Sequence, residues 1–526
     1  MKIKAALLVD GQTLSKWHQE ALSEAADLLD VVLILNCSNT VTRKRVFAHA
    51  GYYALNMLSI RSALTRAQPV EFGKIEVVTF DSLYSGAWQT IPDEIVDAMR
   101  TKGVRTIIKF GMSLLRMDNL DGVDVLSFHH GDPRFYRGRP AGFYEIQNNA
   151  TCVGMIVQKL SNVLDGGEVL ALGHSKLYPH SYRQTIQGLY QASPALFRRA
   201  LMNYRNGLTV AIKPKGKNYR LPGNWTVAKF CARMLSRKFS RLLYGALFEK
   251  KWNIVIRDDL DVFSRAHVRV SGGRRPRVPK KYSFLADPFF SSDGSVVRAE
   301  AMVASSGLGE IVEFDERTLE FSRKLLAGPH FSYPYTVTDA GKEFILPEVA
   351  GHEAPYLLTP SGNVKTPLRG LESARIVDPS LVRHGDHYFL FGGHPQSAAG
   401  MLYVYVADAL DGPYLPHPMN PVVMDPSCAR MGGRLIQRDG ALYRFGQDNS
   451  GSYGNGIRIM QVTTLSPDAY EEREVGELRF SDAKGPHTVD VRNGRVVLDF
   501  YVEKFSLLAG YRRLAAVFHS RLRRTG

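Results

Sequence analysis

The sequence predicts two folded domains of different class, a doubly wound α/β domain followed by a five-bladed β-propeller. The first two hundred residues alternate short apolar runs with helical periodicity, which is typical of a mostly parallel sheet with helices on both faces. From about residue 252 the pattern changes to short strands separated by turn residues, and a motif recurs five times, every 45 to 55 residues. With 526 residues and 44% hydrophobic content, the chain can bury two or three cores.

Apolar runs and one helical pattern define the elements expected in the α/β domain. The periodicity of residues 13–28 predicts a helix. The expected strands are residues 5–9, 31–36, 75–80, 105–110 and 123–128. Functional residues of such sheets lie beyond the carboxyl ends of the strands. No Gly-x-Gly-x-x-Gly motif is present, so a nicotinamide-binding domain is not predicted.

A group of polar residues follows the last of these strands. His129 precedes Arg137-Gly138 by eight residues and Asp165 by thirty-six. This spacing resembles the signature of folate-dependent formyltransferases, in which Asn-x-His is followed by Tyr-Arg-Gly and then by Asp-x-Gly. Ser127 stands where that family has its Asn. A strand-end turn without catalytic function is the alternative interpretation.

The resemblance implies transfer of a formyl group from N10-formyltetrahydrofolate to an amine through a tetrahedral oxyanion. It gives His129 the role of oxyanion donor and Asp165 that of base or orienting group, with Ser127 as a shorter donor. Loss of one oxyanion donor costs roughly 10²–10³ in rate, so the serine predicts slow transfer, altered chemistry or a retired site. The residues that the resemblance places at the folate are Phe110, Gly111, Arg137 and Gly138.

Positive charge is concentrated in two stretches of the chain. Residues 193–252 hold fourteen Lys or Arg against one acid, and residues 504–526 hold six with none. Apolar residues recur at helical spacing in both, which is typical of basic amphipathic helices at an anionic membrane surface. The alternative is that these apolar faces pack on the protein itself. No nucleic-acid-binding motif is present, and no nucleic acid is expected as a partner.

These observations predict four segments and a cytoplasmic protein, peripheral on the inner face of the membrane. The segments are an α/β domain at 1–205, a basic helical linker at 206–251, a propeller at 252–502 and a basic tail at 503–526. The four cysteines lack Cys-x-x-Cys pairing, which predicts neither a disulfide framework nor a metal site. No signal peptide and no apolar stretch of about eighteen residues is expected.

The five repeated motifs predict one blade each. They begin at Ala286-Asp287-Pro, Tyr333-Pro, Val377-Asp378-Pro, Met431-Gly-Gly-Arg434 and Pro486-His487. Each is followed by a second apolar run, and a sandwich of regular hairpins is the alternative fold. Because equivalent positions of the blades converge on the propeller axis, Asp287 and Asp378 are expected to share one pocket.

These motifs resemble the propeller of glycoside hydrolase family 43 and, more closely, the N-terminal region of plant glucosamine inositolphosphorylceramide transferases. The resemblance implies a base at Asp287, an acid at Glu300 or Glu348 and a tuning carboxylate at Asp378. Alternatively, Asp-Pro only begins each blade as a turn. The other side chains expected to bind sugar or phosphate are Arg434, Arg444, Gln447, Asp448 and His487.

Three functions remain open from the sequence. The first is a formyltransferase that acts on an amino sugar of a surface glycan or glycolipid, carried by a nucleotide or a lipid, with the propeller holding this acceptor. In the second, the propeller cleaves or transfers a glycosidic bond and the α/β domain is an inactive scaffold. The third is a non-catalytic, glycolipid-binding protein of the membrane surface.

Overall fold

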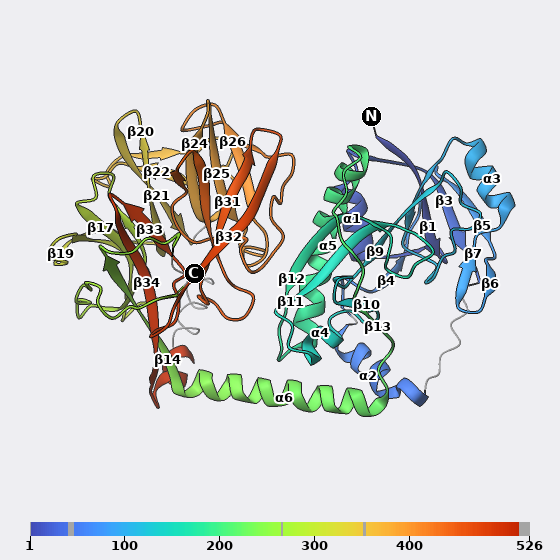
Figure 1. Cartoon of the computed structure of the whole chain (residues 1–526), viewed down its shortest axis with the longest axis horizontal. Helices are drawn as coiled ribbons and strands as arrows, with labels where there is room; N and C mark the ends of the chain where they lie inside the picture. The colour runs from blue at the N-terminus through green and yellow to red at the C-terminus, as the bar shows by residue number, and fades with distance from the viewer. Residues whose placement is uncertain (1, 40–46, 61, 265–266, 351–353, 515–526) are drawn as a thin grey trace. The chain divides into compact units, whose positions relative to one another are not determined.

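The computed structural model describes residues 2–39, 47–60, 62–264, 267–350 and 354–514 (Figure 1). The chain divides into two compact units, Met1–Lys238 and Phe239–Gly526. The border between them falls inside helix α6 (Asn224–Leu247), which itself lies within the basic linker predicted at residues 206–251. Of the predicted basic tail, residues 509–514 are helical, and residues 515–526 lie outside the described part.

The first unit contains a seven-stranded sheet in the order β12-β11-β9-β8-β1-β3-β5. Strands β9, β8, β1, β3 and β5 pair in parallel, whereas β11 pairs antiparallel with both β9 and β12. The strands are β1 (Ile3–Asp10), β3 (Leu29–Cys37), β5 (Glu76–Phe80), β8 (Thr106–Lys109), β9 (Asp124–His129), β11 (Cys152–Lys159) and β12 (Glu168–Lys176). This order confirms the predicted doubly wound, mostly parallel sheet.

Helices cover both faces of this sheet. On one face, Leu8, Ile107 and Val125 pack with Val96 and Met99 of α3. The helices of the unit are α1 (Lys16–Glu24), α2 (Ala50–Ser59), α3 (Asp93–Thr101), α4 (Phe143–Gln147) and α5 (Tyr182–Arg205), with a 3₁₀ turn at Phe47–His49. Three small ribbons complete it: β2 (Thr13–Ser15) with β4 (Ala67–Pro69), β6 (Leu83–Ser85) with β7 (Trp88–Thr90), and β10 (Tyr136–Gly138) with β13 (Lys217–Tyr219).

The opposite face carries α1 and α5. The ring of Phe128 on β9 lies 5.0 Å from Trp17 of α1 and 5.5 Å from Phe197 of α5. Successive side chains of a strand point to opposite faces, so Val125, Ser127 and His129 point away from Phe128. The two catalytic candidates on β9 therefore share the face that α3 covers further down the strand.

Helix α1 is shorter than its sequence pattern predicts. The pattern indicated a helix over residues 13–28, but Thr13–Ser15 forms strand β2 and the helix spans Lys16–Glu24. Ser15 is the N-cap, and its backbone N–H donates to Nδ1 of His18 at 3.4 Å. Pairing of Thr13–Ser15 with β4, a contact distant in sequence, satisfies backbone groups that a helix would otherwise use.

The second unit is a five-bladed propeller, as the repeats predicted. In the last blade, β14 from the beginning of the unit pairs with β34 from its end, and β34 pairs with β33. This pairing of the first long strand with the last strands closes the ring. The blades are β16–β19 (Tyr282–Phe290, Val296–Val303, Gly309–Asp315, Phe321–Leu326), β20–β23 (Phe331–Asp339, Lys342–Val349, Tyr356–Leu358, Lys365–Pro367), β24–β27 (Val377–His384, His387–Gly393, Tyr403–Ala407, Leu415–Pro416), β28–β32 with β15 (Arg430–Met431, Ile436–Arg438, Ala441–Gln447, Ile457–Leu465, Tyr470–Phe480, His267–Val268), and β14 with β33 and β34 (Phe248–Arg257, Val489–Arg492, Arg495–Phe505).

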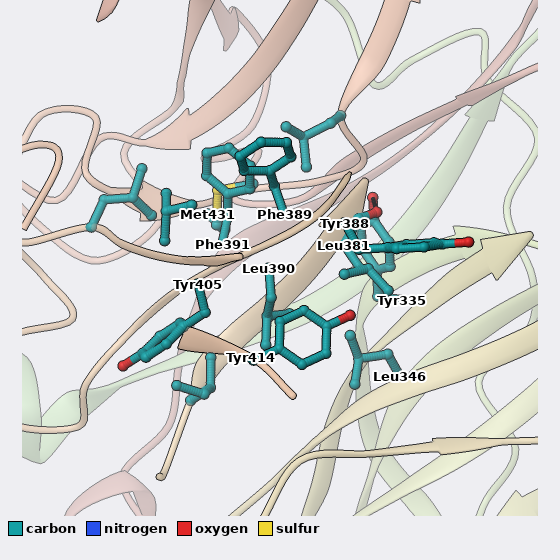
Figure 2. Close-up of a cluster of buried hydrophobic side chains, with 14 of the residues drawn as sticks. Tyr335, Leu346, Leu381, Tyr388, Phe389, Leu390, Phe391, Tyr405, Tyr414 and Met431 are labelled. Carbon is teal, nitrogen blue, oxygen red and sulfur yellow. Dashed lines mark hydrogen bonds between the residues drawn. The ribbon is translucent and has the colours of Figure 1, made fainter. Parts of the chain in front are cut away.

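The largest core cluster of the propeller is rich in aromatic side chains (Figure 2). Phe389 and Phe391 of β25 are fully buried, and the ring of Tyr335 lies on the neighbouring blade. Tyr335 also donates a hydrogen bond to the carbonyl oxygen of Leu381 at 2.9 Å, which joins the second blade to the third. Burial of such large side chains between blades fixes the position of each inner strand at the axis.

Helix α6 has both packed and exposed apolar side chains. Phe230 stacks on Phe143 of α4 with ring centres 4.2 Å apart, whereas Trp225, Phe239 and Leu242 are mostly exposed. Thus only part of its apolar face packs on the protein. No helix in the described part of the chain is both long and apolar enough to cross a bilayer.

Candidate functional site

The histidine of the predicted formyl-transfer site is held on both sides. His129 is the last residue of β9, and its Nδ1 lies 3.2 Å from Oδ1 of Asp165. Its Nε2 lies 3.2 Å from the main-chain carbonyl oxygen of Tyr136. A carboxylate and a carbonyl only accept hydrogen bonds, so each ring nitrogen that carries a proton has an acceptor beside it. His129 thus lies at the end of a central strand with its ring oriented by Asp165, and a ligand that approaches Nε2 would compete with the carbonyl oxygen of Tyr136.

The Tyr-Arg-Gly segment positions Asp165 as well as contributing to the site. The backbone N–H of Gly138 donates to Oδ2 of Asp165 at 2.7 Å, and Nε of Arg137 donates to the carbonyl oxygen of Leu164 at 3.0 Å. Gly138 has φ of 83°, and a Cβ there would lie 2.1 Å from the carbonyl oxygen of Tyr219. Only glycine fits, so the Arg-Gly pair predicted for folate binding also anchors the loop that carries the aspartate.

Phe110 and Gly111 occupy different environments. Phe110 stacks on His18 at 4.1 Å and belongs to the aromatic cluster under α1 and α5. Gly111 sits against β1, where a Cβ would meet the carbonyl carbon of Val9 at 2.6 Å. Its role is close backbone packing at the carboxyl end of the sheet.

A cavity of about 620 Å³ opens beside His129. Such a volume is typical of small-molecule sites. Aromatic rings, histidines and the Gly138–Ala141 turn line it, and they include Tyr52, Phe128, His129, His130, Arg139, Tyr182 and Tyr190. An aromatic wall beside an N–H donor can hold a flat heterocycle with its reactive group at the histidine.

Ser127, in the position of the family's Asn, is buried next to a lysine. The Ser127 Oγ makes a long contact of 3.4 Å with the carbonyl oxygen of Phe128. Lys109 of β8 is its direct partner in the parallel ladder. Burial lowers the pKa of Lys109 to about 8, although the charges of Asp10 and Asp165 act in the opposite direction. Sequence reasoning missed this lysine; the signal was a cation at the end of an otherwise apolar strand.

In the propeller, the Asp-Pro motifs form a repeated backbone irregularity. Asp287, Tyr333 and Asp378 have φ of 48°, 47° and 50°, and each lies at a break in the ladder between the first two strands of its blade. Such conformations cost non-glycine residues roughly 1–3 kcal/mol and cluster at functional sites. The sequence interpretation of Asp-Pro as a simple turn therefore accounts for only part of this feature.

The predicted carboxylates do converge. Thr488 Oγ1 donates to Oδ1 of Asp287 at 2.7 Å, and Nε2 of His487 lies 3.5 Å from the same oxygen. Asp378 is held by Arg430 at 2.6 Å and by Gln447 Nε2 at 3.0 Å. These partners come from other blades, so the aspartates meet at the axis.

Two glutamates join this group, and the pKa of each is raised. Burial, reinforced by Asp378, raises the pKa of Glu348 to about 8, while Glu348 accepts a hydrogen bond from the Asp378 backbone N–H at 2.9 Å. Burial and the charges of Asp287 and Glu348 raise the pKa of Glu300 well above its usual range. The cluster thus combines two carboxyl groups whose pKa values are raised with an aspartate that is paired to Arg430, a combination that suits acid–base chemistry.

Three predicted sugar-binding residues have other partners. Arg434 pairs with Asp490 at 2.7 Å, Arg444 pairs with Glu472 at 2.6 Å and is fully buried, and Asp448 accepts from Arg479 at 2.8 Å. Their polar groups join strands within the propeller. The sequence predicted that these residues bind sugar or phosphate, but it could not show which way their side chains point.

Arg430 and Asp499 are residues of the axial cluster that sequence reasoning missed. Asp499 lies on the last strand, and Asp287, His487 and Asp499 bring their ligand atoms within 4.8 Å of one another, close enough to hold a metal ion. The cysteine spacing that predicted no metal site carries no information about such a cluster. Both missed residues lie next to a repeated motif: Arg430 directly precedes Met431, and Asp499 pairs with the backbone of His487.

Most of the propeller is similar in sequence to a known family of domains. The family model for the N-terminal region of glucosamine inositolphosphorylceramide transferase 1 matches residues 317–503. The transferase of that name from Arabidopsis thaliana is 29% identical over 211 residues, which cover 37% of this chain and 27% of the relative. That from Oryza sativa subsp. japonica is 27% identical over 225 residues, covering 38% and 29%. The chain therefore spans less than a third of these relatives.

Solved formyltransferases align with part of the chain. A sugar N-formyltransferase from a Shewanella species is 12% identical, with a TM-score of 0.28, covering 44% of this chain and 88% of that one. Phosphoribosylglycinamide formyltransferase from Anaplasma phagocytophilum is 10% identical, with a TM-score of 0.29, covering 42% and 97%. The fold of the first unit rests on the strand order described above.

Proposed function

We propose that the first unit transfers a formyl group from N10-formyltetrahydrofolate to the amino group of a sugar in a surface glycan or glycolipid. One observation carries the proposal: His129, held by Asp165, presents its ring beside a cavity of about 620 Å³ at the carboxyl end of the sheet. The aromatic lining of this cavity suits the flat ring of a folate.

The site residues divide the chemistry between them. A new C–N bond forms between the sugar amine and the formyl carbon, and the formyl oxygen gains negative charge. Nε2 of His129 stabilises that charge by exchanging its hydrogen bond to the Tyr136 carbonyl oxygen for one to the formyl oxygen. Asp165 accepts the proton that the amine loses, and N10 of the donor takes up a proton as the old C–N bond breaks. The products are the N-formyl sugar and tetrahydrofolate.

The propeller supports the assignment of a sugar acceptor. It is similar to a region of proteins named as glucosamine inositolphosphorylceramide transferases. Glucosamine carries a primary amine, which is the group that a formyl acceptor must offer. We therefore propose that the propeller binds an amino sugar, linked either to a nucleotide or to a lipid.

Calorimetric titration with a stable N10-formyltetrahydrofolate analogue tests the proposal, with His129→Ala as the matched variant. We expect micromolar binding by the wild type, followed by formylation of at least one of glucosamine, UDP-glucosamine and a glucosaminyl lipid. The variant should be folded and lose at least about 100-fold in turnover. A folded wild type that does not bind the analogue would overturn the assignment.

A second function is supported by the axial cluster of the propeller. Glu348, with its raised pKa, and Asp378, paired with Arg430, offer an acid and a carboxylate near one another. Such a pair suits cleavage or transfer of a glycosidic bond. In that case Asp287→Asn should abolish turnover of aryl glycosides and leave folate binding unchanged. Unchanged glycoside turnover in this variant would exclude Asp287 as the catalytic base of the propeller.

A further inference from the structure

A row of three polar side chains crosses the sheet beneath His129. In the ladder, Lys109 of β8 lies opposite Ser127 of β9, and Ser127 lies opposite Gln158 of β11. Ile107 and Val125, two residues earlier on β8 and β9, pack together in one core cluster. Because side chains alternate along a strand, Lys109 and Ser127 point to this same face, as does His129.

Lys109 lies in an unusual place for a cation. It is partly buried at the carboxyl end of a central strand, and within the described residues its Nζ makes no hydrogen bond or ion pair. The carboxylates that act on its charge are Asp10, at the end of β1, and Asp165 of the proposed site. Asp10 accepts a hydrogen bond from the backbone N–H of Met112 at 2.9 Å. An unpartnered ammonium is costly to bury, so its retention calls for a role.

We propose that Lys109 is a catalytic residue of the first unit, whose ammonium supplies the oxyanion donor that is missing at Ser127. This inference rests on the proposed formyl transfer. The serine side chain is shorter than an asparagine and leaves room beside it for the lysine. During transfer the ammonium donates a hydrogen bond to the formyl oxygen as that oxygen becomes negative. The lysine keeps its proton and forms no covalent bond.

A purely structural role for Lys109 makes different predictions. As a counter-ion for Asp10 and Asp165, it would affect stability and the binding of all ligands alike. As an oxyanion donor, it would affect the turnover number more than the Michaelis constant, because the charge on the oxygen develops only in the transition state. It would also be replaceable by another donor that reaches the same oxygen.

The test compares Lys109→Met, Ser127→Asn and the double variant, with Lys4→Met as the control. Lys4 is a lysine of β1, and its Nζ bonds to the carbonyl oxygen of Lys102. We expect Lys109→Met to lower kcat by roughly 10²–10³ with little change in KM, because one oxyanion donor is lost. The double variant should recover at least 10-fold, and Lys4→Met should match the wild type.

The pH profile provides a second readout. Since only the ammonium form donates, wild-type kcat should fall as the pH rises through about 8, the value that burial gives the pKa of Lys109. The titratable groups facing it are Asp10, His129 and Asp165. The alkaline decline should disappear in the double variant, where asparagine, which does not titrate, supplies the donor. A decline that persists unchanged would count against the lysine.

The outcomes separate this inference from the proposed function. Lys109→Met with wild-type kcat, in a protein that transfers formyl groups, would overturn the role of the lysine and leave the proposed function standing. A folded wild type that neither binds the formyl analogue nor transfers the group would overturn both. Calorimetry adds a check without turnover: Lys109→Met should bind the formylated analogue about as tightly as the wild type does, because the negative charge develops only in the transition state. A large loss of analogue binding in this variant would contradict the role of Lys109 as an oxyanion donor.

Discussion

The two units each combine a buried histidine with aspartate, in contrasting surroundings. In the first unit, His129 has one carboxylate partner, Asp165, and faces a cavity of about 620 Å³. In the propeller, His487 lies between Asp287 and Asp499, and further carboxyl groups crowd around it. A lone carboxylate orients its histidine, whereas crowded carboxylates compete for protons and raise one another's pKa. The same residue types thus give a histidine oriented by one carboxylate in the first unit and a group of carboxyl side chains with raised pKa values in the propeller.

The two regions also differ in how the backbone presents these side chains. In the first unit they lie at the ends of regular parallel strands, where the sheet alone brings them together. In the propeller, Asp287 and Asp378 depend on a strained, positive-φ conformation at a break in each ladder. Strain of this kind must be offset by packing elsewhere, so the propeller site should depend more strongly on the stability of its fold.

The largest expected effect is a loss of propeller stability when a buried ion pair is broken. Arg444→Met removes the cation that neutralises buried Glu472, and the loss of one partner from such a pair costs about 3–5 kcal/mol. Urea unfolding should show this loss in the propeller, while analogue binding by the first unit stays unchanged. Arg438→Met, which breaks an exposed pair with Asp261, should leave the midpoint almost unaltered. Equal effects of the two variants would contradict the structural role of Arg444.

A smaller effect concerns the protons of the axial cluster. Burial and Asp378 raise the pKa of Glu348 to about 8, above the ordinary glutamate value. Its contribution to stability is therefore complete at acid pH and is lost as the pH rises through about 8. Glu348→Gln should flatten the decline of propeller stability between pH 5 and 9 measured by thermal unfolding. Glu300 titrates in the same direction, so some decline should remain.

The control for this experiment is Glu320→Gln, at an exposed position of the first blade. It should leave the slope of stability against pH unchanged. If Glu348→Gln leaves the slope of stability against pH unaltered, the Glu348 carboxyl group does not have a raised pKa in the folded protein. The pH dependence would then arise from another carboxyl group of the cluster.

The smallest effect involves a surface that neither site uses. Phe239 and Leu242 of α6 are exposed beside the exposed Lys238, a pattern that favours an anionic lipid surface. We expect binding to phosphatidylserine vesicles that weakens with salt. Lys238→Met should reduce it roughly five-fold, since each juxtamembrane cation contributes about 1 kcal/mol. Lys342→Met, in the second blade, is the control, and binding that does not respond to salt would contradict this interpretation.

The sequence patterns predicted the fold of both units and some of the residues that meet at each candidate site. Strand periodicity and the five repeats predicted the strands and the blades, because the alternation of apolar residues and the spacing of turns are local properties of the sequence. Spacing also brought His129 and Asp165 together. Lys109 was missed because its position beside Ser127 depends on the register of two strands. Repeat position could not show which way Arg434 and Arg444 point.

The closure of the propeller has a consequence for how this protein is made. Strand β14 leaves the ribosome roughly 240 residues before β34, the strand with which it pairs. At ordinary rates of synthesis that interval is on the order of tens of seconds. Throughout it, the apolar side chains of β14 have no partner strand, while the blades in between can already form. Until translation has passed residue 505, the unpaired edge of β14 can therefore pair with other chains. A chaperone that covers this edge during synthesis would prevent such aggregation.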